Sequence, residues 1–299
     1  MTKFLLDSGD PQEYKELQQL ARENDSELWG STTNPSLIAK KLSGKKITPE
    51  EAFKLQKELV LEIVKIVPGA VSAEVYATQN TTAEDMIVQG LDIATWHERV
   101  VVKLPTTSEG FKARTALRQK GITINNTLVF SQEQIFAISL HEKIMLDSVA
   151  TKATWPCFIS PFVGRLDDKG QNGMSLVSNG MRIITDYFPK DTVWMLEASV
   201  RNAVHLKKGI ELNSDLITAP LKAYTEWFAM TKDQQDSLAT TAPAMLTDIP
   251  AWTPSQELQN ITTIEAFMNA LANGSLNISH PLTTTGIDKF VADWQAILS

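Results

Sequence analysis

One lysine stands where a buried amine could carry out covalent chemistry. Lys103 follows three valines, and strand alternation places Val101 and Lys103 on one face and Val102 and Leu104 on the other. Apolar surroundings disfavour the charged ammonium, and a neutral amine attacks carbonyl carbons to form a Schiff base. The alternative is a lysine whose amine reaches past the strand end into water. Lys103 alone does not decide between the two.

Carboxylates and small polar groups follow other short apolar runs. Schiff-base aldol chemistry needs a group that accepts and donates protons, and Asp7 and Glu74 are the candidate carboxylates. The hydroxyl and amide side chains that could hold substrate hydroxyls are Asn34, Asn125, Thr127, Ser160 and Ser199.

Two arginines, Arg165 and Arg201, follow successive apolar runs. The planar guanidinium fork matches phosphate bidentately. Each arginine alone would more often form a surface salt bridge, but as a pair beside the other polar groups they indicate a phosphorylated sugar substrate.

Short apolar runs with strand-like lengths alternate with amphipathic stretches. The predicted strands are residues 3–7, 28–31, 71–77, 100–104, 122–125, 156–162, 192–197 and 215–218. Eight strands alternating with helices over about residues 1–222 predict an α/β fold, a closed (β/α)8 barrel, in which polar groups at the carboxyl ends of the strands form the site. An open doubly wound sheet is the second choice, and the absence of a glycine-rich nucleotide-binding motif counts against it.

Helix signals lie between these runs. The predicted helix starts have capping residues at Asp10, Thr48, Thr82 and Ser131. Gly121 and Gly209 are placed where helices would end.

The last part of the chain, about residues 223–299, carries no further strand signal. Prolines separate helical stretches at residues 262–273 and 285–298. We expect one domain over residues 1–299, with this extension packed on the barrel. Three tryptophans in it, Trp227, Trp252 and Trp294, are expected to pack there. The role of residues 223–285 stays open.

Composition narrows the function classes. The 299 residues carry a formal net charge of −7, and an acidic balance argues against general nucleic-acid binding. The single cysteine, Cys157, excludes an internal disulfide and fits a reducing compartment. No apolar run approaches the ~20 residues of a membrane span, and four scattered histidines form no metal motif. We expect a soluble, cytoplasmic protein without a membrane or nucleic-acid partner.

Segments that occur in order along about two thirds of the chain resemble the transaldolase family. They read FLLDSGD at 4–10, STTNPSLI at 31–38, VVVKLPTT at 100–107, GITINNTLVFS at 121–131, ISPFVGR at 159–165 and EASVRN at 197–202. Any one match would be weak, whereas the ordered set is specific.

The resemblance implies a class I aldolase barrel that uses no metal or organic cofactor. Lys103 would form the Schiff base, Asp7 would take the proton of the carbon-4 hydroxyl, and Glu74 with Thr127 would hold a proton-relaying water. The residues that would bind substrate are Asn34, Asn125 and Ser160 at the dihydroxyacetone hydroxyls and Arg165, Ser199 and Arg201 at the phosphate. The implied reaction, in the non-oxidative pentose phosphate pathway, moves a dihydroxyacetone unit from sedoheptulose 7-phosphate or fructose 6-phosphate to glyceraldehyde 3-phosphate or erythrose 4-phosphate.

A related family, the fructose-6-phosphate aldolases, releases free dihydroxyacetone instead. Those enzymes carry Gln where this chain has Glu74 and Tyr where it has Phe162, so both positions favour transfer. Val200 departs from the phenylalanine that transaldolases often carry between Ser199 and Arg201. A sugar-phosphate-binding barrel without catalysis, or a Schiff-base aldolase with an aldehyde donor, remains an alternative. Homo-oligomerisation and the preferred sugar phosphates stay open.

Overall fold

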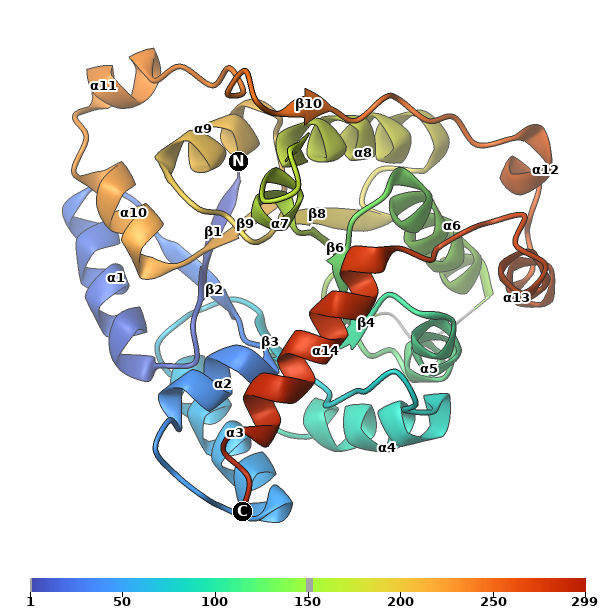
Figure 1. Ribbon diagram of the computed structural model, residues 1–299, viewed down its shortest axis with the longest axis horizontal. Helices are drawn as coiled ribbons and strands as arrows, with labels where there is room; N and C mark the ends of the chain where they lie inside the picture. Colours follow the sequence, from blue (N-terminus) through green and yellow to red (C-terminus); the bar gives the residue numbers. More distant parts are fainter. Residues whose placement is uncertain (1, 149–152) are drawn as a thin grey trace.

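The computed structural model describes residues 2–148 and 153–299, and within them eight parallel strands close into a barrel (Figure 1). Around the barrel the strands are β1 (Lys3–Asp7), β2 (Leu28–Thr32), β3 (Val71–Glu74), β4 (Val100–Pro105), β5 (Ile124–Val129), β6 (Cys157–Pro161), β8 (Val193–Glu197) and β9 (Leu216–Ala219). Strand β1 pairs with both β2 and β9, which closes the ring. The predicted (β/α)8 barrel is confirmed, and the open sheet is excluded.

Helices connect the strands and cover the outside of the barrel (Figure 1). They are α1 (Pro11–Glu23), α2 (Pro35–Lys41), α3 (Pro49–Val64), α4 (Ala83–Ala94), α5 (Ser108–Gln119), α6 (Gln132–Ser148), α7 (Val163–Asp167), α8 (Gly173–Tyr187), α9 (Ala203–Glu211) and α10 (Leu221–Phe228). The remaining helices are α11 (Lys232–Ser237), α12 (Gln256–Gln259), α13 (Ile264–Ala272) and α14 (Pro281–Gln295).

The four predicted helix starts are confirmed by their caps. The side chains of Asp10 and Thr48 accept hydrogen bonds from the first turns of α1 and α3. Thr82 forms a full capping box with Asp85. Ser131 forms a capping box with Gln134 of α6. The Ser131 Oγ accepts a hydrogen bond from the Gln134 backbone nitrogen, and the Ser131 backbone nitrogen donates one to the Gln134 side chain. These caps satisfy backbone groups that a helix start leaves unpaired.

Two local predictions are wrong. Gly209 lies inside α9 and does not end it. Glycine is needed there for packing, because a Cβ would lie 2.0 Å from the Glu197 carboxylate. The extension also contains a strand, β10 (Thr247–Asp248), which pairs with β7 (Gln171–Asn172). Strands of two residues are too short to show a periodic pattern. By contrast, Gly121 does follow α5, with a φ of 75° that suits glycine.

Two strands, β5 and β3, end at other residues than predicted. Strand β5 runs four residues past Asn125, with an irregular register near Leu128, whose φ is 59°. Strand β3 ends at Glu74, three residues early. Thr127 therefore lies in the strand, and not after it.

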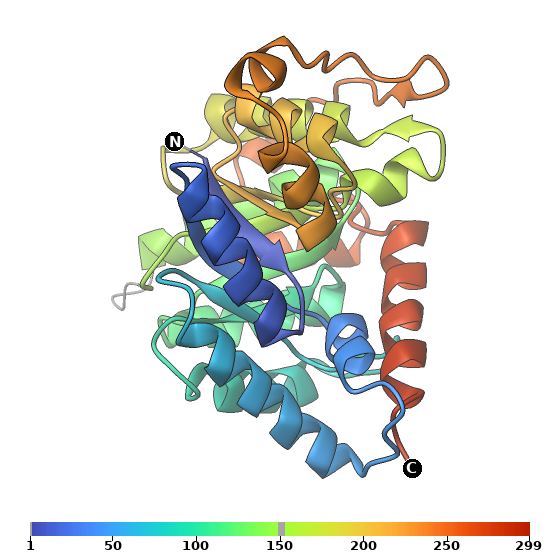
Figure 2. The same ribbon diagram turned by 90° about the vertical axis from the view of Figure 1, so that its left-hand side faces the viewer.

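The final helix, α14, crosses the barrel at the end where the strands finish (Figures 1 and 2). It packs against α2 and β5. Its buried side chains include Ile287, Phe290 and Trp294. The predicted packing of the extension over the barrel is thus observed at the mouth, where polar side chains gather.

Candidate active site

Lys103 and Glu74 are direct neighbours on β4 and β3, inside the barrel. The Lys103 Nζ lies 3.0 Å from the Glu74 Oε2, and both side chains are 3% exposed. The same Nζ donates a hydrogen bond of 2.9 Å to the Thr33 carbonyl oxygen. Because Oε2 has no hydrogen-bond partner within the described residues, its contact with Lys103 is an ion pair and not an aligned hydrogen bond. Lys103 therefore points into the interior, which excludes an amine directed into water.

The Glu74 carboxyl is tuned towards neutral pH. Burial raises its pKa to about 7, although the positive charge of Lys103 pulls in the opposite direction. The Gln56 Nε2 donates a hydrogen bond to the Glu74 carbonyl oxygen, which helps to hold the end of β3. Glu74 can therefore gain or lose a proton at physiological pH, directly beside an amine.

Asp7, the last residue of β1, supplies a second carboxylate near the same lysine. Its Oδ1 accepts a 2.7 Å hydrogen bond from the Thr32 hydroxyl, which also pairs with Thr218. Burial raises the pKa of Asp7, whereas the charge of Lys103 lowers it. A carboxyl with a raised pKa can both accept and return a proton.

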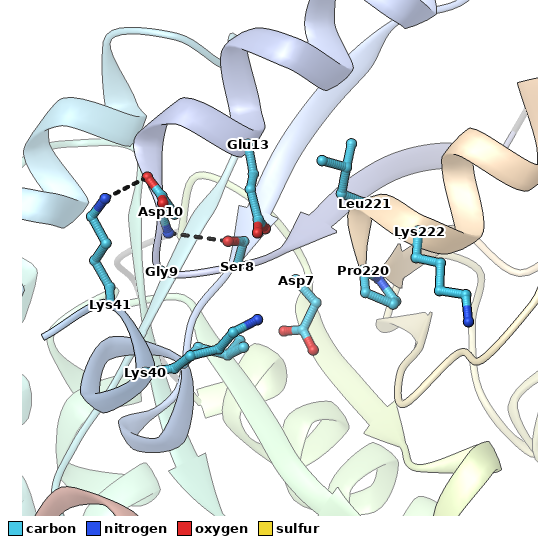
Figure 3. Close-up of a pocket in the computed structure, with 11 residues that line it drawn as sticks. Asp7, Ser8, Gly9, Asp10, Glu13, Lys40, Lys41, Pro220, Leu221 and Lys222 are labelled. Atoms are coloured by element: carbon cyan, nitrogen blue, oxygen red, sulfur yellow. Dashed lines mark hydrogen bonds and ion pairs between the residues drawn. The ribbon is translucent and has the colours of Figure 1, made fainter. Parts of the chain in front are cut away.

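The Asp7 carboxyl also lines a cavity of about 450 Å³ at the barrel mouth (Figure 3). Lys40 of α2 and Lys222 of α10 lie on either side of it, and Asp10 pairs with Lys41 at 2.9 Å. Asp7 can thus be reached from outside, while Lys103 lies deeper.

Several of the predicted hydroxyl and amide side chains lie on or near β5, the strand that pairs with β4 beside Lys103. Asn125, fully buried, donates to the Ser72 hydroxyl at 3.1 Å and accepts from the Ser160 hydroxyl at 2.7 Å. The buried Thr127 hydroxyl has no hydrogen-bond partner within the described residues. Such an unpaired buried group is costly unless water or a ligand binds it. Asn34 differs, because its Oδ1 caps α2 by accepting from Leu37.

The two arginines lie together at the ends of adjacent strands. Arg165 follows β6, and Arg201 follows β8, which pairs with β6. Burial lowers the pKa of Arg165, and the nearby charge of Arg201 lowers it further. Arg201 is half exposed and donates a 2.9 Å hydrogen bond to Asp168. The two positive charges repel each other, so this arrangement of Arg165 and Arg201 is unfavourable unless an anion lies near.

Two predicted residues flank the arginines. The Phe162 ring centroid is 5.3 Å from the Arg165 guanidinium carbon. Ser199 adopts a φ of 58°, unusual for a residue other than glycine, and its carbonyl accepts from Gly164. Strain of this kind is frequent at functional sites. The strained backbone places Ser199 in the turn between β8 and Arg201.

Sequence reasoning gave no structural role to several small residues that hold the site together. They are Thr32, Thr33, Ser72 and Thr218. Alternation could have found Ser72, which shares the interior face of β3 with Glu74. Phe290 of α14, which contacts Arg165, had no such signal.

No cluster of three or more His, Cys, Asp and Glu side chains that could bind a metal occurs in residues 2–148 and 153–299. The neighbouring Asp167 and Asp168 instead pair with His205 and Arg201. Cys157 is fully buried, and burial raises its pKa to about 11. None of the helices in this part of the chain has the length and apolarity to cross a membrane.

The fold and the site together define a parallel (β/α)8 barrel protein with an amine, carboxylates and arginines at the carboxyl ends of its strands. Residues 4–299 match the family described as Transaldolase/Fructose-6-phosphate aldolase, and the chain belongs to this family. It is thus a transaldolase-like aldolase.

The sequences of individual relatives align with this chain over nearly its whole length. A "Probable transaldolase" of Methanococcus maripaludis is 32% identical over 98% of this chain and 98% of its own. One of Myxococcus xanthus is 32% identical over 99% of this chain and 95% of its own. One of Geobacter metallireducens is 31% identical over 99% of both. The extension after residue 222 is therefore shared with these relatives.

Proposed function

We propose that this protein is a transaldolase that carries a dihydroxyacetone unit as a Schiff base on Lys103. The unit moves from sedoheptulose 7-phosphate or fructose 6-phosphate to an aldose phosphate, as in the non-oxidative pentose phosphate pathway of the cytoplasm. The observation that carries the proposal is the buried Lys103 amine 3.0 Å from Glu74, a carboxyl whose pKa is raised to about 7.

The first step attaches the donor to the lysine. The Lys103 ammonium of the ion pair first gives a proton to Glu74, the neutral amine then attacks the ketone carbon, and the resulting carbinolamine loses water to give an iminium. Glu74 takes the proton that the amine releases and returns one to the departing hydroxyl. The unpaired Thr127 hydroxyl can hold the water that carries these protons. Asn125, held by Ser72 and Ser160, is the neighbour of Lys103 on β5 and can bind the donor hydroxyls.

The second step breaks the bond between carbons 3 and 4. Asp7 takes the proton of the carbon-4 hydroxyl while the bonding electrons move into the iminium, so that an aldose leaves and an enamine stays on Lys103. A second aldose phosphate then accepts the enamine carbon, and Asp7 returns the proton to its new hydroxyl. Water finally hydrolyses the iminium. Arg165 and Arg201 bind the phosphate of donor and acceptor in turn.

Transfer and release are distinguished by following the products of fructose 6-phosphate with and without erythrose 4-phosphate. A transaldolase forms sedoheptulose 7-phosphate and glyceraldehyde 3-phosphate only when the acceptor is present. Free dihydroxyacetone at the same rate in both mixtures would contradict transfer and identify a release enzyme. No product from either mixture would contradict catalysis on this donor.

The pH profile should report on Glu74. Its carboxylate form, which accepts the proton, exists mainly above its pKa of about 7. We therefore expect the rate of Schiff-base formation in the wild type to fall as the pH decreases through about 7. Glu74→Gln should slow the step and remove this acid limb. The exposed Glu58→Gln is the matched control and should keep the wild-type pH profile. If Glu74→Gln also kept the acid limb, the limb would belong to a group other than Glu74.

Loss of either arginine should weaken phosphate binding. Hydrogen bonds to charged groups contribute about 1.5–3 kcal/mol, so Arg165→Ala should raise the KM for fructose 6-phosphate roughly 10- to 100-fold. Arg201→Ala should have a smaller effect, because Arg201 is half exposed and already paired with Asp168. Steady-state kinetics measure both, with the exposed Arg22→Ala as the control. Unchanged KM in both variants would remove the proposed phosphate site.

Phe162 should set the balance between transfer and release. A hydroxyl at this ring, as in Phe162→Tyr, could protonate the three-carbon enamine and let dihydroxyacetone leave. We expect a several-fold rise in the ratio of free dihydroxyacetone to transferred product. Phe53→Tyr adds the same hydroxyl to a ring on α3, and we expect it to leave the ratio of free dihydroxyacetone to transferred product unchanged. An unchanged ratio in Phe162→Tyr would contradict the role given to this ring.

A further inference from the structure

The final helix reaches the phosphate side of the mouth through two residues one turn apart. The Phe290 ring centroid lies 5.5 Å from the guanidinium carbon of Arg165. A Cβ on Gly286 would lie 2.8 Å from the Arg165 Nη1 and 2.6 Å from a Leu128 methyl carbon. The missing side chain at Gly286 therefore lets α14 approach Arg165 closely.

The position of the Arg165 side chain depends on aromatic neighbours, whereas Arg201 has a polar partner. Within the described residues, Arg201 forms an ion pair with Asp168, whereas no ion pair or side-chain hydrogen bond holds Arg165. Its guanidinium contacts two rings instead, Phe162 at 5.3 Å and Phe290 at 5.5 Å. Cation–π contacts of this kind are strongest where water is excluded, and both rings are buried.

The helix that carries Phe290 is itself fixed to the barrel. Near its start, Thr283 donates to the Leu128 carbonyl at 2.9 Å and accepts from Gln134 at 3.0 Å. Near its end, Ser36 of α2 donates to Asp293. The position of Phe290 is therefore set by contacts of α14 with β5, α6 and α2. A fixed ring can orient a side chain that has no polar partner of its own.

We propose that Phe290 is a positioning residue, which holds the Arg165 guanidinium ready for phosphate, so that the C-terminal helix determines the preference for phosphorylated donors. This inference rests on the proposed function, since it requires Arg165 to bind the substrate phosphate. It gives the end of the extension a part in substrate selection in addition to its packing.

The test compares a phosphorylated with an unphosphorylated substrate. Phe290→Leu should raise the KM for fructose 6-phosphate roughly 3- to 10-fold with little change in kcat, because a cation–π contact is lost. Schiff-base trapping with dihydroxyacetone, which has no phosphate, should stay at the wild-type rate. Phe290→Tyr keeps the aromatic face and should restore the KM.

Two further variants separate positioning from folding. Gly286→Ala improves helix propensity but pushes on Arg165, so it should also raise the KM for fructose 6-phosphate. Phe267→Leu is the matched control, because Phe267 is buried in α13 against Phe111 and His141, on another side of the barrel. It should lower the melting temperature without changing the KM.

The double variant Phe290→Leu with Arg165→Ala decides whether Phe290 acts through Arg165. If it does, Phe290→Leu should have no further effect on the KM once Arg165 is absent. The inference would be overturned if Phe290→Leu raised the KM by the same factor with and without Arg165. It would also be overturned if Phe290→Leu slowed Schiff-base trapping with dihydroxyacetone as much as the reaction with fructose 6-phosphate. A wild-type protein that does not react with fructose 6-phosphate would instead overturn the proposed function, so that the two failures are distinguishable.

Discussion

Replacing Lys103 by methionine should reduce turnover to the background of the assay. The iminium nitrogen is the electron sink for carbon–carbon cleavage, and without the amine neither attachment of the donor nor cleavage is available. Enzymes typically exceed the uncatalysed rate by about 10⁶-fold or more, and we expect most of that gain to depend here on one buried amine. Stopped assays of product formation, and adduct trapping on the same samples, measure the loss.

The Lys103→Met variant should still fold. Removing one partner of a buried ion pair usually costs about 3–5 kcal/mol, but Glu74 has a raised pKa and can become neutral by taking up a proton. Methionine is flexible enough to fill the space. Circular dichroism and thermal unfolding test this, with the exposed Lys54→Met as the matched control for activity. Residual turnover or a trapped adduct in folded Lys103→Met would refute the assignment.

Replacing Asp7 by asparagine should slow cleavage about 10²- to 10⁴-fold, the usual contribution of a general acid–base group. Asparagine keeps the shape and the hydrogen bond from Thr32 but cannot take the carbon-4 proton. Lys103 remains in place, so the Schiff base should still form. Borohydride should therefore trap the intact six-carbon ketose phosphate in place of a three-carbon unit, a difference that mass spectrometry resolves directly.

Asp10 provides the matched control for Asp7. It lies three residues further along, caps α1 and pairs with Lys41 at the surface. Asparagine is an equally good capping residue, so Asp10→Asn should change neither the rate nor the adduct. A three-carbon adduct in Asp7→Asn, formed at the wild-type rate, would show that another group takes the proton.

The sequence predicts the barrel because each strand has its own local signal. Short apolar runs give the strands, capping residues give the helix starts, and the polar residue at the end of each run indicates the functional face. Alternation correctly places Lys103 with Val101 in the interior. These features are local, and a parallel barrel brings the ends of its strands to one rim, so local patterns are enough to assemble the main polar groups.

Features that depend on contacts between distant segments are not predictable in this way. Gly209 is a packing residue, because the buried Glu197 carboxyl fills the space where its side chain would be. Burial raises the pKa of Glu197 well above its usual value, which favours a neutral acid at this position. Phe290 contacts Arg165, which lies 125 positions earlier in the chain. Periodicity within a segment contains no information on such contacts.

The proposed function depends on a three-carbon unit that is carried on Lys103. The most direct measurement is to incubate the protein with fructose 6-phosphate, reduce with borohydride, and map the adduct by peptide mass spectrometry. We predict that the peptide containing Lys103 carries the reduced three-carbon unit, with the mass of dihydroxyacetone less one water and plus two hydrogens, and that no other lysine carries it. An adduct on a different lysine, or no adduct on protein shown to be folded, would contradict it.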